Sequence, residues 1–338
     1  MSNHPMPATP EPSIEAFTFG EPVPVLSQRE LFDYLESAWN GRWYEPPLSL
    51  VGLARVYRAA VHHASAIQIK RNILRAGFIP HPKLPLAEFT ALVMDFLVFG
   101  NGYLGKVSNR LGGALRYEHL HAKYVRRGRL PEQYWWVAEA GKPLELPAGS
   151  VGQVKESDIN QEIYGIPDYV ASVNSALLNE SATLFRRKYY ENGSHAGFIM
   201  YMTDPLHNET DIVALRKALK ESKGPGNFRN LLLYAPNGKK DGVQLIPVSE
   251  VAAKDEFLTI KNVTRDDQLA ANRVPPQLMG VLPNNTGGFG DAAKAALVFD
   301  ATEMDSIRAS LMELNDWAGE EIISFKPYRL TEMTGQAA

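Results

Sequence analysis

Three long segments in the second half of the chain place apolar residues at the spacing of an α-helix, at 167–191, 250–272 and 291–319. The first would form a rod of about 37 Å at 1.5 Å per residue, which is long for a small globular core. Pro167 suits a first helical turn, and Asn192–Gly193 suits a left-handed stop. Helices of this length must bury their apolar stripes against a partner, and a closed ring of head-to-tail copies would supply neighbours on both sides.

The part of the chain before these helices consists of a proline-rich arm and a region of mixed helical and strand patterns. Six prolines fall within the first 24 residues, and this density predicts an extended or disordered arm over 1–27. The arm is either a tail without a role or a strap that orders against a neighbouring subunit. The part that follows mixes helical and strand patterns, so we expect an α+β domain there. Its predicted helices are 28–37, 50–63 and 86–99, and its predicted strands are 103–107 and 133–137.

The segment between the first two long helices, 195–248, reads as a compact insert of its own. A short helix is predicted at 211–220, and two apolar runs at 231–234 and 243–246 flank a Pro-Asn-Gly turn. The two runs therefore predict a hairpin-like pair of strands. A last apolar strand is predicted at 322–325.

Composition excludes several classes of protein. With 45% hydrophobic and 22% charged residues the chain can bury a core. The 35 basic and 38 acidic residues give a net charge of −3, which argues against a protein that grips nucleic acid over a long surface. The charge is uneven, since 102–129 carries +6 and 291–325 carries −6, and the two stretches either face different partners or are solvated surfaces. The absence of cysteine excludes disulfides, thiolate metal sites and a cysteine nucleophile.

A search for catalytic groups finds no convincing site. The glycines before Asp291 lack the Lys and Ser/Thr of a phosphate-binding loop, and an acid-rich helix follows them. His62–His63 point to different faces of a helix, and Asp266–Asp267 do the same. His119 and His121 could share a strand face, but no third ligand is evident, so structural histidines are expected. We expect a non-enzyme without cofactor or metal, with no signal peptide and no membrane span, hence a soluble intracellular protein.

Several longer segments resemble one family, the portal (head–tail connector) proteins of contractile-tailed temperate phages, of the PBSX-like type. The resemblance covers about 15–330, nearly the whole chain. The segments that carry it are Phe17-Thr-Phe-Gly-Glu-Pro-Val-Pro24, Asn40-Gly-Arg-Trp-Tyr-Glu-Pro-Pro47, Ala60-Val-His-His63, Phe96-Leu-Val-Phe-Gly-Asn101, Ala182-Thr-Leu-Phe-Arg-Arg-Lys-Tyr-Tyr-Glu-Asn-Gly193, His195-Ala-Gly197, Val274-Pro-Pro-Gln-Leu-Met-Gly280 and Glu313-Leu-Asn-Asp-Trp317.

This resemblance implies a portal fold and a dodecameric ring at one capsid vertex of the virion, assembled in the host cytoplasm. Double-stranded DNA would pass through the ring during packaging and ejection. The implied partners are the terminase large subunit, which hydrolyses ATP, capsid or scaffold protein, and head-completion and tail proteins, with no membrane. The implied layout is an arm at 1–27, a wing at 28–166 and 291–330, stem helices at 167–194 and 249–275, a clip at 195–248, a tunnel loop at 276–290 and a tail at 331–338.

Candidate site residues follow from that layout and carry no catalytic role. The tunnel loop facing DNA would present Asn284, Asn285, Thr286, Gly287, Gly288, Phe289 and Gly290. The stem would bring Arg186, Arg187, Lys188, Lys254, Lys261 and Arg265 to the channel. The clip would offer the terminase or connector Arg216, Lys217, Lys220, Lys223, Arg229, Lys239 and Lys240. The family often has proline in the last long helix where this chain has Ser306, so no proline kink is expected there.

Two alternatives remain from the residues alone. One is a nucleotide-dependent enzyme built around the glycines at 287–290, and the other is a DNA-binding adaptor that uses the basic stretch 102–129. The charge balance favours a conduit over both. A channel that lets DNA slide should not neutralise many phosphates, because each neutralised phosphate adds affinity.

Overall fold

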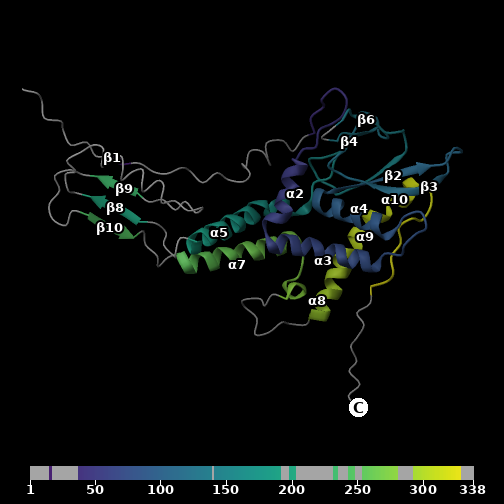
Figure 1. Ribbon diagram of the computed structural model, residues 1–338. Helices are drawn as coiled ribbons and strands as arrows, with labels where there is room; N and C mark the ends of the chain where they lie inside the picture. Colours follow the sequence, from purple (N-terminus) through teal and green to yellow (C-terminus); the bar gives the residue numbers. More distant parts are fainter. Residues whose placement is uncertain are drawn as a thin grey trace, which may run out of the picture. The chain divides into compact units, whose positions relative to one another are not determined.

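The computed structural model describes residues 15–16, 37–138, 141–191, 198–202, 231–234, 243–247, 253–280 and 292–328 of the chain (Figure 1). It divides into two compact units. The smaller unit comprises Met1–Pro24 with Ser181–Lys261, and the larger comprises Val25–Glu180 with Asn262–Ala338. Among the described residues, no helix combines the length and the apolar character needed to cross a bilayer.

Two small antiparallel sheets form the β part of the larger unit. In the first, β2 (Asn101–Ser108) lies between β3 (Ala114–Leu120) and β7 (Val151–Lys155). The second contains β4 (Val125–Arg127), β5 (Tyr134–Trp136) and β6 (Leu144–Glu145), with β5 in the centre. The predicted strand 103–107 is therefore confirmed within β2, and the predicted strand 133–137 is confirmed over its three central residues, which form β5. Together with the helices, they confirm the α+β class.

Helix α4 (Leu86–Phe99) confirms the predicted helix 86–99 to the residue. It ends at Gly100, which has a φ of +67°, a left-handed conformation that favours glycine. A Cβ at this position would also lie 2.6 Å from the Pro167 nitrogen, so the close approach of the two segments requires glycine. Gly100 thus turns the chain directly from α4 into β2.

The predicted single helix 50–63 is wrong. The chain forms α2 (Leu50–Ala59) and α3 (Val61–Gly77), separated at Ala60, whose φ of −129° and ψ of 133° are extended. Ala60 itself is buried, whereas Val61, the first residue of α3, is 72% exposed. Of the predicted helix 28–37, residues 28–36 lie outside the described residues, and Ser37 is not helical.

Helix α2 begins at an N-cap whose contribution to the free energy of unfolding should be measurable. The Ser49 hydroxyl accepts a hydrogen bond from the Gly52 amide at 3.1 Å. Ser49→Ala removes this acceptor and should lower the free energy of unfolding by about 1 kcal/mol in urea denaturation. Ser306→Ala, at an exposed position inside a helix, is the control and should change stability by less than about 0.5 kcal/mol. Equal stability of the two variants would contradict the capping role.

The last long helix spans 292–318 and is irregular. It consists of α8 (Ala292–Phe299), the π-helical turn η3 (Asp300–Met304), α9 (Asp305–Met312) and α10 (Leu314–Ala318). This confirms the predicted helix 291–319, except that residue 291 lies outside the described residues. The irregularity comes from the π-turn just before Ser306, and no proline is involved.

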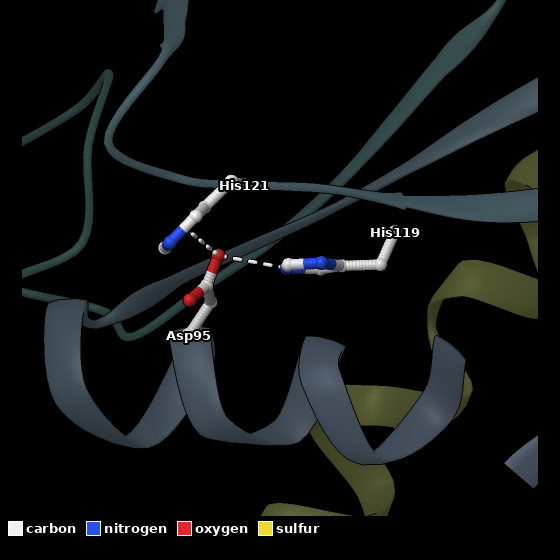
Figure 2. Close-up of side chains that lie close together, drawn as sticks. All are labelled: Asp95, His119 and His121. Atoms are coloured by element: carbon white, nitrogen blue, oxygen red, sulfur yellow. Dashed lines mark hydrogen bonds and ion pairs between the residues drawn. The ribbon is translucent and has the colours of Figure 1, made fainter. Parts of the chain in front are cut away.

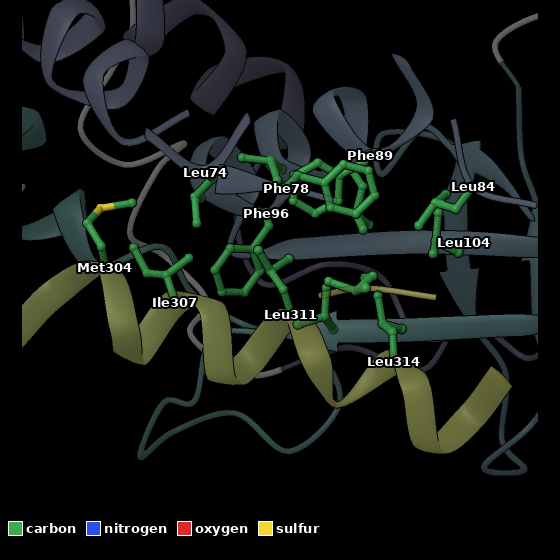
Figure 3. Packing of buried hydrophobic residues seen from close by; sticks show 14 of the residues in the cluster. Leu74, Phe78, Leu84, Phe89, Phe96, Leu104, Met304, Ile307, Leu311 and Leu314 are labelled. Carbon is green, nitrogen blue, oxygen red and sulfur yellow. The ribbon is translucent and has the colours of Figure 1, made fainter. Parts of the chain in front are cut away.

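This helix supplies one side of the main core. Met304, Ile307, Leu311 and Leu314 are buried against α3, α4 and β2, as Figure 3 shows. The apolar residues at helical spacing in this segment are thus buried at these four positions, whereas Leu297, at the same spacing, is half exposed. In the same core the rings of Phe78 and Phe89 stack with their centroids 3.8 Å apart.

The predicted strand 322–325 is wrong. Only Phe325 forms a bridge, to Phe78, although Ile322 and Ile323 are fully buried. The reason is a side chain that takes the place of a partner strand. Asn315 Oδ1 accepts hydrogen bonds from the amides of Ile322 and Ile323, and its Nδ2 donates to the Ile323 carbonyl.

The other two long helices are paired. After the 3₁₀ turn η1 (Asp168–Ser172), α5 runs over Val173–Glu191, and α7 runs over Ala253–Ala271. The predicted helix 167–191 is confirmed, with its first turn in 3₁₀ form and Pro167 as the preceding cap. The second prediction, 250–272, is confirmed over α7, while residues 250–252 lie outside the described residues. Contacts of Ser175 with Asp267 and of Asn179 with Thr264 make the pair antiparallel.

The smaller unit contains a four-stranded sheet with the order β1-β9-β8-β10. Its strands are β1 (Glu15–Ala16), β8 (Phe198–Met202), β9 (Leu231–Tyr234) and β10 (Val243–Pro247). The predicted hairpin is wrong, because β8 lies between the two expected partners. Strand β9 pairs with β8 in parallel and β10 pairs with it antiparallel. The expected helix 211–220 and the turn at 236–238 lie outside the described residues.

Candidate functional site

Polar side chains join the two paired helices within the larger unit. Asn179 Nδ2 donates to Thr264 Oγ1 at 2.7 Å, and both residues are buried. One turn away, the Ser175 hydroxyl donates to the Asp267 carboxylate at 2.7 Å. Buried hydrogen bonds of this kind fix the register of two helices, because a shift would leave the polar groups without partners.

The end of α7 carries a strained cation. Arg273 has a φ of +54°, the only positive φ among the described residues other than glycines. Its guanidinium lies 2.6 Å from Asp168 Oδ2 and 3.3 Å from Glu303 Oε2. Partial burial lowers the pKa of Arg273, but these two carboxylates outweigh it and raise the pKa overall. The two ion pairs thus hold the turn after α7 against η1 and the last helix.

Glu303 also pairs with a second cation, from α3. Its Oε1 lies 2.6 Å from Lys70 Nζ, and both side chains are more than nine-tenths buried. A small cavity of about 60 Å³ adjoins this pair and is lined in part by Glu156 and Asp168. Burial and the Asp168 carboxylate raise the pKa of Glu156. Helix α3, the last long helix, the turn after α7 and the turn η1 therefore meet at one charged junction, in which the Lys70–Glu303 pair is buried.

A buried histidine completes the junction. The His63 amide donates to Gln268 Oε1 at 3.1 Å, and its ring lies with its centroid 4.3 Å from that of Tyr169. Asn272 Nδ2 donates to the Gln268 carbonyl and faces His63 Nδ1 at 3.2 Å, which makes Nδ1 the acceptor. Burial lowers the pKa of His63 to about 4. The expectation of a structural histidine agrees with this environment.

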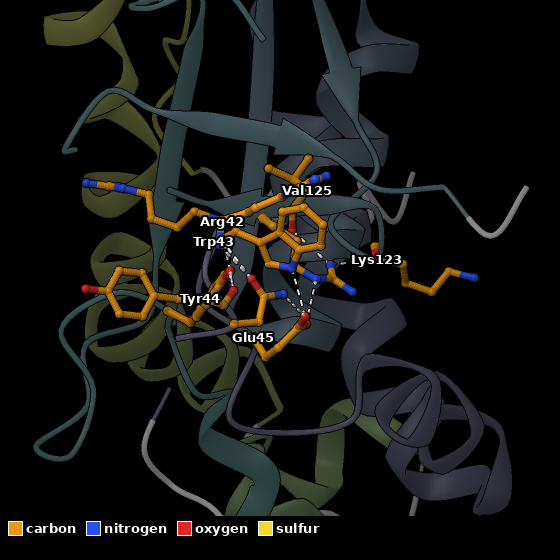
Figure 4. Close-up of polar contacts among 10 residues, drawn as sticks. Arg42, Trp43, Tyr44, Glu45, Lys123 and Val125 are labelled. Atoms are coloured by element: carbon orange, nitrogen blue, oxygen red, sulfur yellow. Dashed lines mark hydrogen bonds and ion pairs between the residues drawn. The ribbon is translucent and has the colours of Figure 1, made fainter. Parts of the chain in front are cut away.

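The basic stretch 102–129 is partly neutralised by its own surroundings. Arg126 lies against Glu45 and donates to the Lys123 carbonyl at 2.8 Å. Figure 4 shows the contacts that converge on the Glu45 carboxylate, including the one from the Trp43 indole. Arg127 donates to Tyr134 and Gln153, and Arg116 pairs with Glu118. Three of the seven cations therefore already bind protein groups, which weakens the alternative of a DNA-binding adaptor.

Several acidic side chains of the stretch 291–325 are likewise paired with cations within the fold. Arg308 binds Asp300 across the π-turn at 2.5 Å and also Asp305 at 2.5 Å. Glu320 pairs with Lys83 and accepts a hydrogen bond from the Tyr117 hydroxyl. These contacts lower the pKa of Glu320, with the Lys83 hydrogen bond as the main cause. Part of the local excess of acid is thus used within the fold.

The predicted channel and docking residues are only partly described. Arg186 and Arg187 are exposed on α5. Burial and the nearby charge of Arg186 lower the pKa of Lys261 on α7, so these two predicted residues lie close together within the smaller unit. Arg265 contacts Asp266 at 2.8 Å. Lys188 and Lys254 lie on the two helices, but their side chains fall outside the described residues, as do all the predicted tunnel-loop and clip residues.

One cluster was missed by the sequence analysis. His119, at the end of β3, and His121 both contact the same Asp95 carboxylate oxygen, at 2.8 and 3.0 Å (Figure 2). The expectation that no third ligand accompanies the two histidines is therefore wrong. The third group comes from α4, 24 residues earlier, on a mostly apolar helix where an isolated Asp gave the only available signal.

The sequence is similar to that of portal proteins from phages. The chain is 54% identical over 319 residues to the probable portal protein of Escherichia phage P2, covering 94% of this chain and 93% of the relative. It is 34% identical over 279 residues to the probable portal protein of Haemophilus phage HP1, covering 81% of each. No family model matches the chain.

Solved structures share the fold at low sequence identity. A chain in the neck of a native gene transfer agent particle, computed with C12 symmetry, has a TM-score of 0.58 at 17% identity and covers 89% of both chains. An HK97-family phage portal protein from Corynebacterium diphtheriae has a TM-score of 0.53 at 12% identity over 81% of this chain. The sequence relatives cover nearly the whole chain and the fold agrees with them. This chain therefore belongs to the family of phage portal proteins.

Proposed function

We propose that the chain assembles into a closed ring of twelve copies at one vertex of a phage capsid and forms the channel through which double-stranded DNA enters and leaves. The observation that carries this proposal is the 54% identity to a probable portal protein over 94% of the chain. The copy number rests on the C12 symmetry of a gene transfer agent neck that shares the fold.

Exposed apolar side chains support assembly with further copies. Leu178 and Leu184 on α5, Val263 on α7, and Leu297 and Val298 on α8 are each between 42% and 62% exposed. They lie on the three long helices that the periodicity singled out. Apolar residues repeated along helix faces favour burial in an interface, and a ring offers each subunit two neighbours.

The layout within the ring follows the family pattern. We assign α5 and α7 to the stem, with Arg186 and Lys261 facing the channel, and the segment between these helices to the clip that docks the terminase large subunit and later the connector. The wing would comprise 28–166 and 291–330, and the loop 276–290 would lie nearest the DNA. Capsid or scaffold protein and head-completion and tail proteins are the further partners that we infer.

The chain itself is proposed to catalyse no reaction. Neither close relative is named for an enzymatic activity. In this proposal the ATP that drives packaging is hydrolysed by the terminase. We infer assembly in the host cytoplasm, followed by a place in the virion.

Assembly into a ring is directly testable with purified protein. Twelve chains of 37.5 kDa give a particle of about 450 kDa. Mass photometry at micromolar protein should show this species, and negative-stain imaging should show rings with a central hole. Substituting Leu297 and Val298 together by Asp should shift the mass toward the monomer, while Ile79→Asp, at an exposed position outside the three long helices in sequence, should leave it unchanged.

The mass measurement and two binding experiments distinguish the ring from the nucleotide-dependent enzyme and the DNA-binding adaptor. A strict monomer under these conditions would overturn the ring. Equilibrium dialysis with ATP and with NAD should show no binding, whereas binding would favour the nucleotide-dependent enzyme. Tight, salt-sensitive binding of duplex DNA by the monomer would favour the adaptor.

A further inference from the structure

The larger unit contains a carboxylate in an unusual place. Asp95 lies on α4, where the other buried residues are all apolar, and is itself only 5% exposed. One of its oxygens, Oδ2, accepts from the Ala122 amide at 2.6 Å and also contacts His119 Nε2 and His121 Nδ1. Three groups therefore converge on a single oxygen, and two of them are imidazole nitrogens that can also bind a metal ion.

Donor types and spacing fit a transition metal. The ligand atoms of Asp95, His119 and His121 all lie within 4.8 Å of one another. A tetrahedral ion with bonds of about 2.0–2.1 Å separates its ligand atoms by about 3.3 Å. The observed nitrogen–oxygen distances of 2.8 and 3.0 Å are a few tenths of an ångström shorter, which side-chain rotation can supply. Two imidazoles and one carboxylate favour zinc-like ions over Mg²⁺ or Ca²⁺, which prefer oxygen ligands.

The surroundings hold these ligands in place and leave one side open. The Ala122 amide positions Asp95, and the His119 amide donates to Glu88 Oε2 at 2.6 Å, which fixes the end of β3 to α4. The His121 side chain is 41% exposed, whereas those of His119 and Asp95 are 14% and 7% exposed. An ion could therefore enter from the His121 side and keep a water molecule there.

We propose that His119, His121 and Asp95 form a binding site for one divalent transition-metal ion of the zinc class, with the fourth position open to water. The ion would replace the two contacts between histidine nitrogens and the carboxylate. His119 would present Nε2 and carry its proton on Nδ1, and His121 would present Nδ1 and carry its proton on Nε2. Each histidine would thus bind the ion through the ring nitrogen that faces the carboxylate.

Such a site would fasten the loop after β3 to the middle of α4. It is built within one chain and does not depend on ring assembly. Its expected consequence is structural: the ion stabilises the folded state because the three ligands are brought together only there.

The test uses tag-free, full-length protein that has been stripped with EDTA and dialysed. Isothermal titration with Zn²⁺ should give one ion per chain. Co²⁺ should give the intense visible absorption of a four-coordinate ion. A hundredfold excess of Zn²⁺ over its Kd should raise Tm by roughly 5 °C.

Variants decide whether these residues hold the ion. His121→Ala changes the most exposed ligand and should fold, yet it should bind Zn²⁺ at least tenfold more weakly and lose the rise in Tm. His119→Ala should behave in the same way. His81→Ala, a partly buried histidine outside the cluster, should bind like the wild-type chain. Absence of Zn²⁺ binding by the wild-type chain, or equal affinity in His121→Ala, would overturn the proposal and leave a purely hydrogen-bonded cluster.

Discussion

Lys70→Met is expected to destabilise the protein by about 3–5 kcal/mol, because it removes one partner of a buried ion pair. Lys70 Nζ lies 2.6 Å from Glu303 Oε1, and the two side chains are 7% and 8% exposed. After the substitution the Glu303 carboxylate stays buried, and among the described residues Arg273, at 3.3 Å, is its remaining cation. Urea denaturation of wild type and variant would measure the loss.

A double variant separates the cost of an unpaired charge from the value of the pair. Replacing both Lys70 and Glu303 by Met leaves no buried charge, and Arg273 keeps Asp168 at 2.6 Å with its side chain 56% exposed. The double variant should therefore be more stable than Lys70→Met alone. Lys326→Met, at an exposed position, is the control for the substitution itself and should cost less than about 0.5 kcal/mol. A double variant less stable than either single one would contradict this account.

The second large effect is a loss of stability in mild acid that depends on His63. Burial lowers the pKa of His63 from 6.5 to about 4 in the folded chain. Between these values the unfolded chain binds a proton that the folded chain does not, so stability rises with pH across this window and is lost as pH falls through it. The difference corresponds to about 3 kcal/mol between pH 6.5 and pH 4.

Geometry explains why the folded chain resists this proton. His63 Nδ1 faces the Asn272 amide nitrogen, which also donates to the Gln268 carbonyl. A proton on Nδ1 would therefore place two hydrogen-bond donors in contact with no acceptor between them. Among the described residues, His63 Nε2 is buried without a hydrogen-bond partner. A charged ring would therefore be both desolvated and badly paired.

His63→Asn tests the assignment, since an Asn side-chain oxygen can accept from Asn272 but does not titrate. The variant should be less stable than wild type at pH 7 through lost packing against Tyr169, and its stability should fall less steeply from pH 6.5 to 4. His62→Asn changes the neighbouring, less buried histidine and should keep the wild-type slope. Urea midpoints measured at half-unit pH steps would show the difference. An unchanged slope in His63→Asn would assign the acid sensitivity to other groups.

Local sequence patterns predicted the bounds of a helix correctly where residues in or next to that helix determine its start and end. The bounds of α4 were correct because its apolar residues, the preceding Pro85 and the following Gly100 all act within the element itself. The prediction of 50–63 as one helix failed at Ala60. Alanine has no local tendency to break a helix, and the break depends on packing in the core.

Pairing between distant segments could not be predicted from these patterns. Two apolar runs beside an Asn-Gly turn favoured a hairpin, yet β8 separates β9 from β10 in the sheet. The segment 322–325 has strand-like residues, but the backbone groups of Ile322 and Ile323 bond to the Asn315 side chain. In both cases the actual hydrogen-bond partner lies in another element, and the residues of the local segment do not indicate it.

By itself, the sequence determined the long helices, the α+β class, the near balance of charge and a resemblance to portal proteins, because each depends on residue types and their spacing along the chain. The tertiary structure alone decided which charged groups meet. Lys70 and Glu303 are 233 residues apart, and Asp95 reaches His119 and His121 from a different element. Such contacts arise only when packed elements bring distant side chains within a few ångströms and remove the water that would otherwise solvate them.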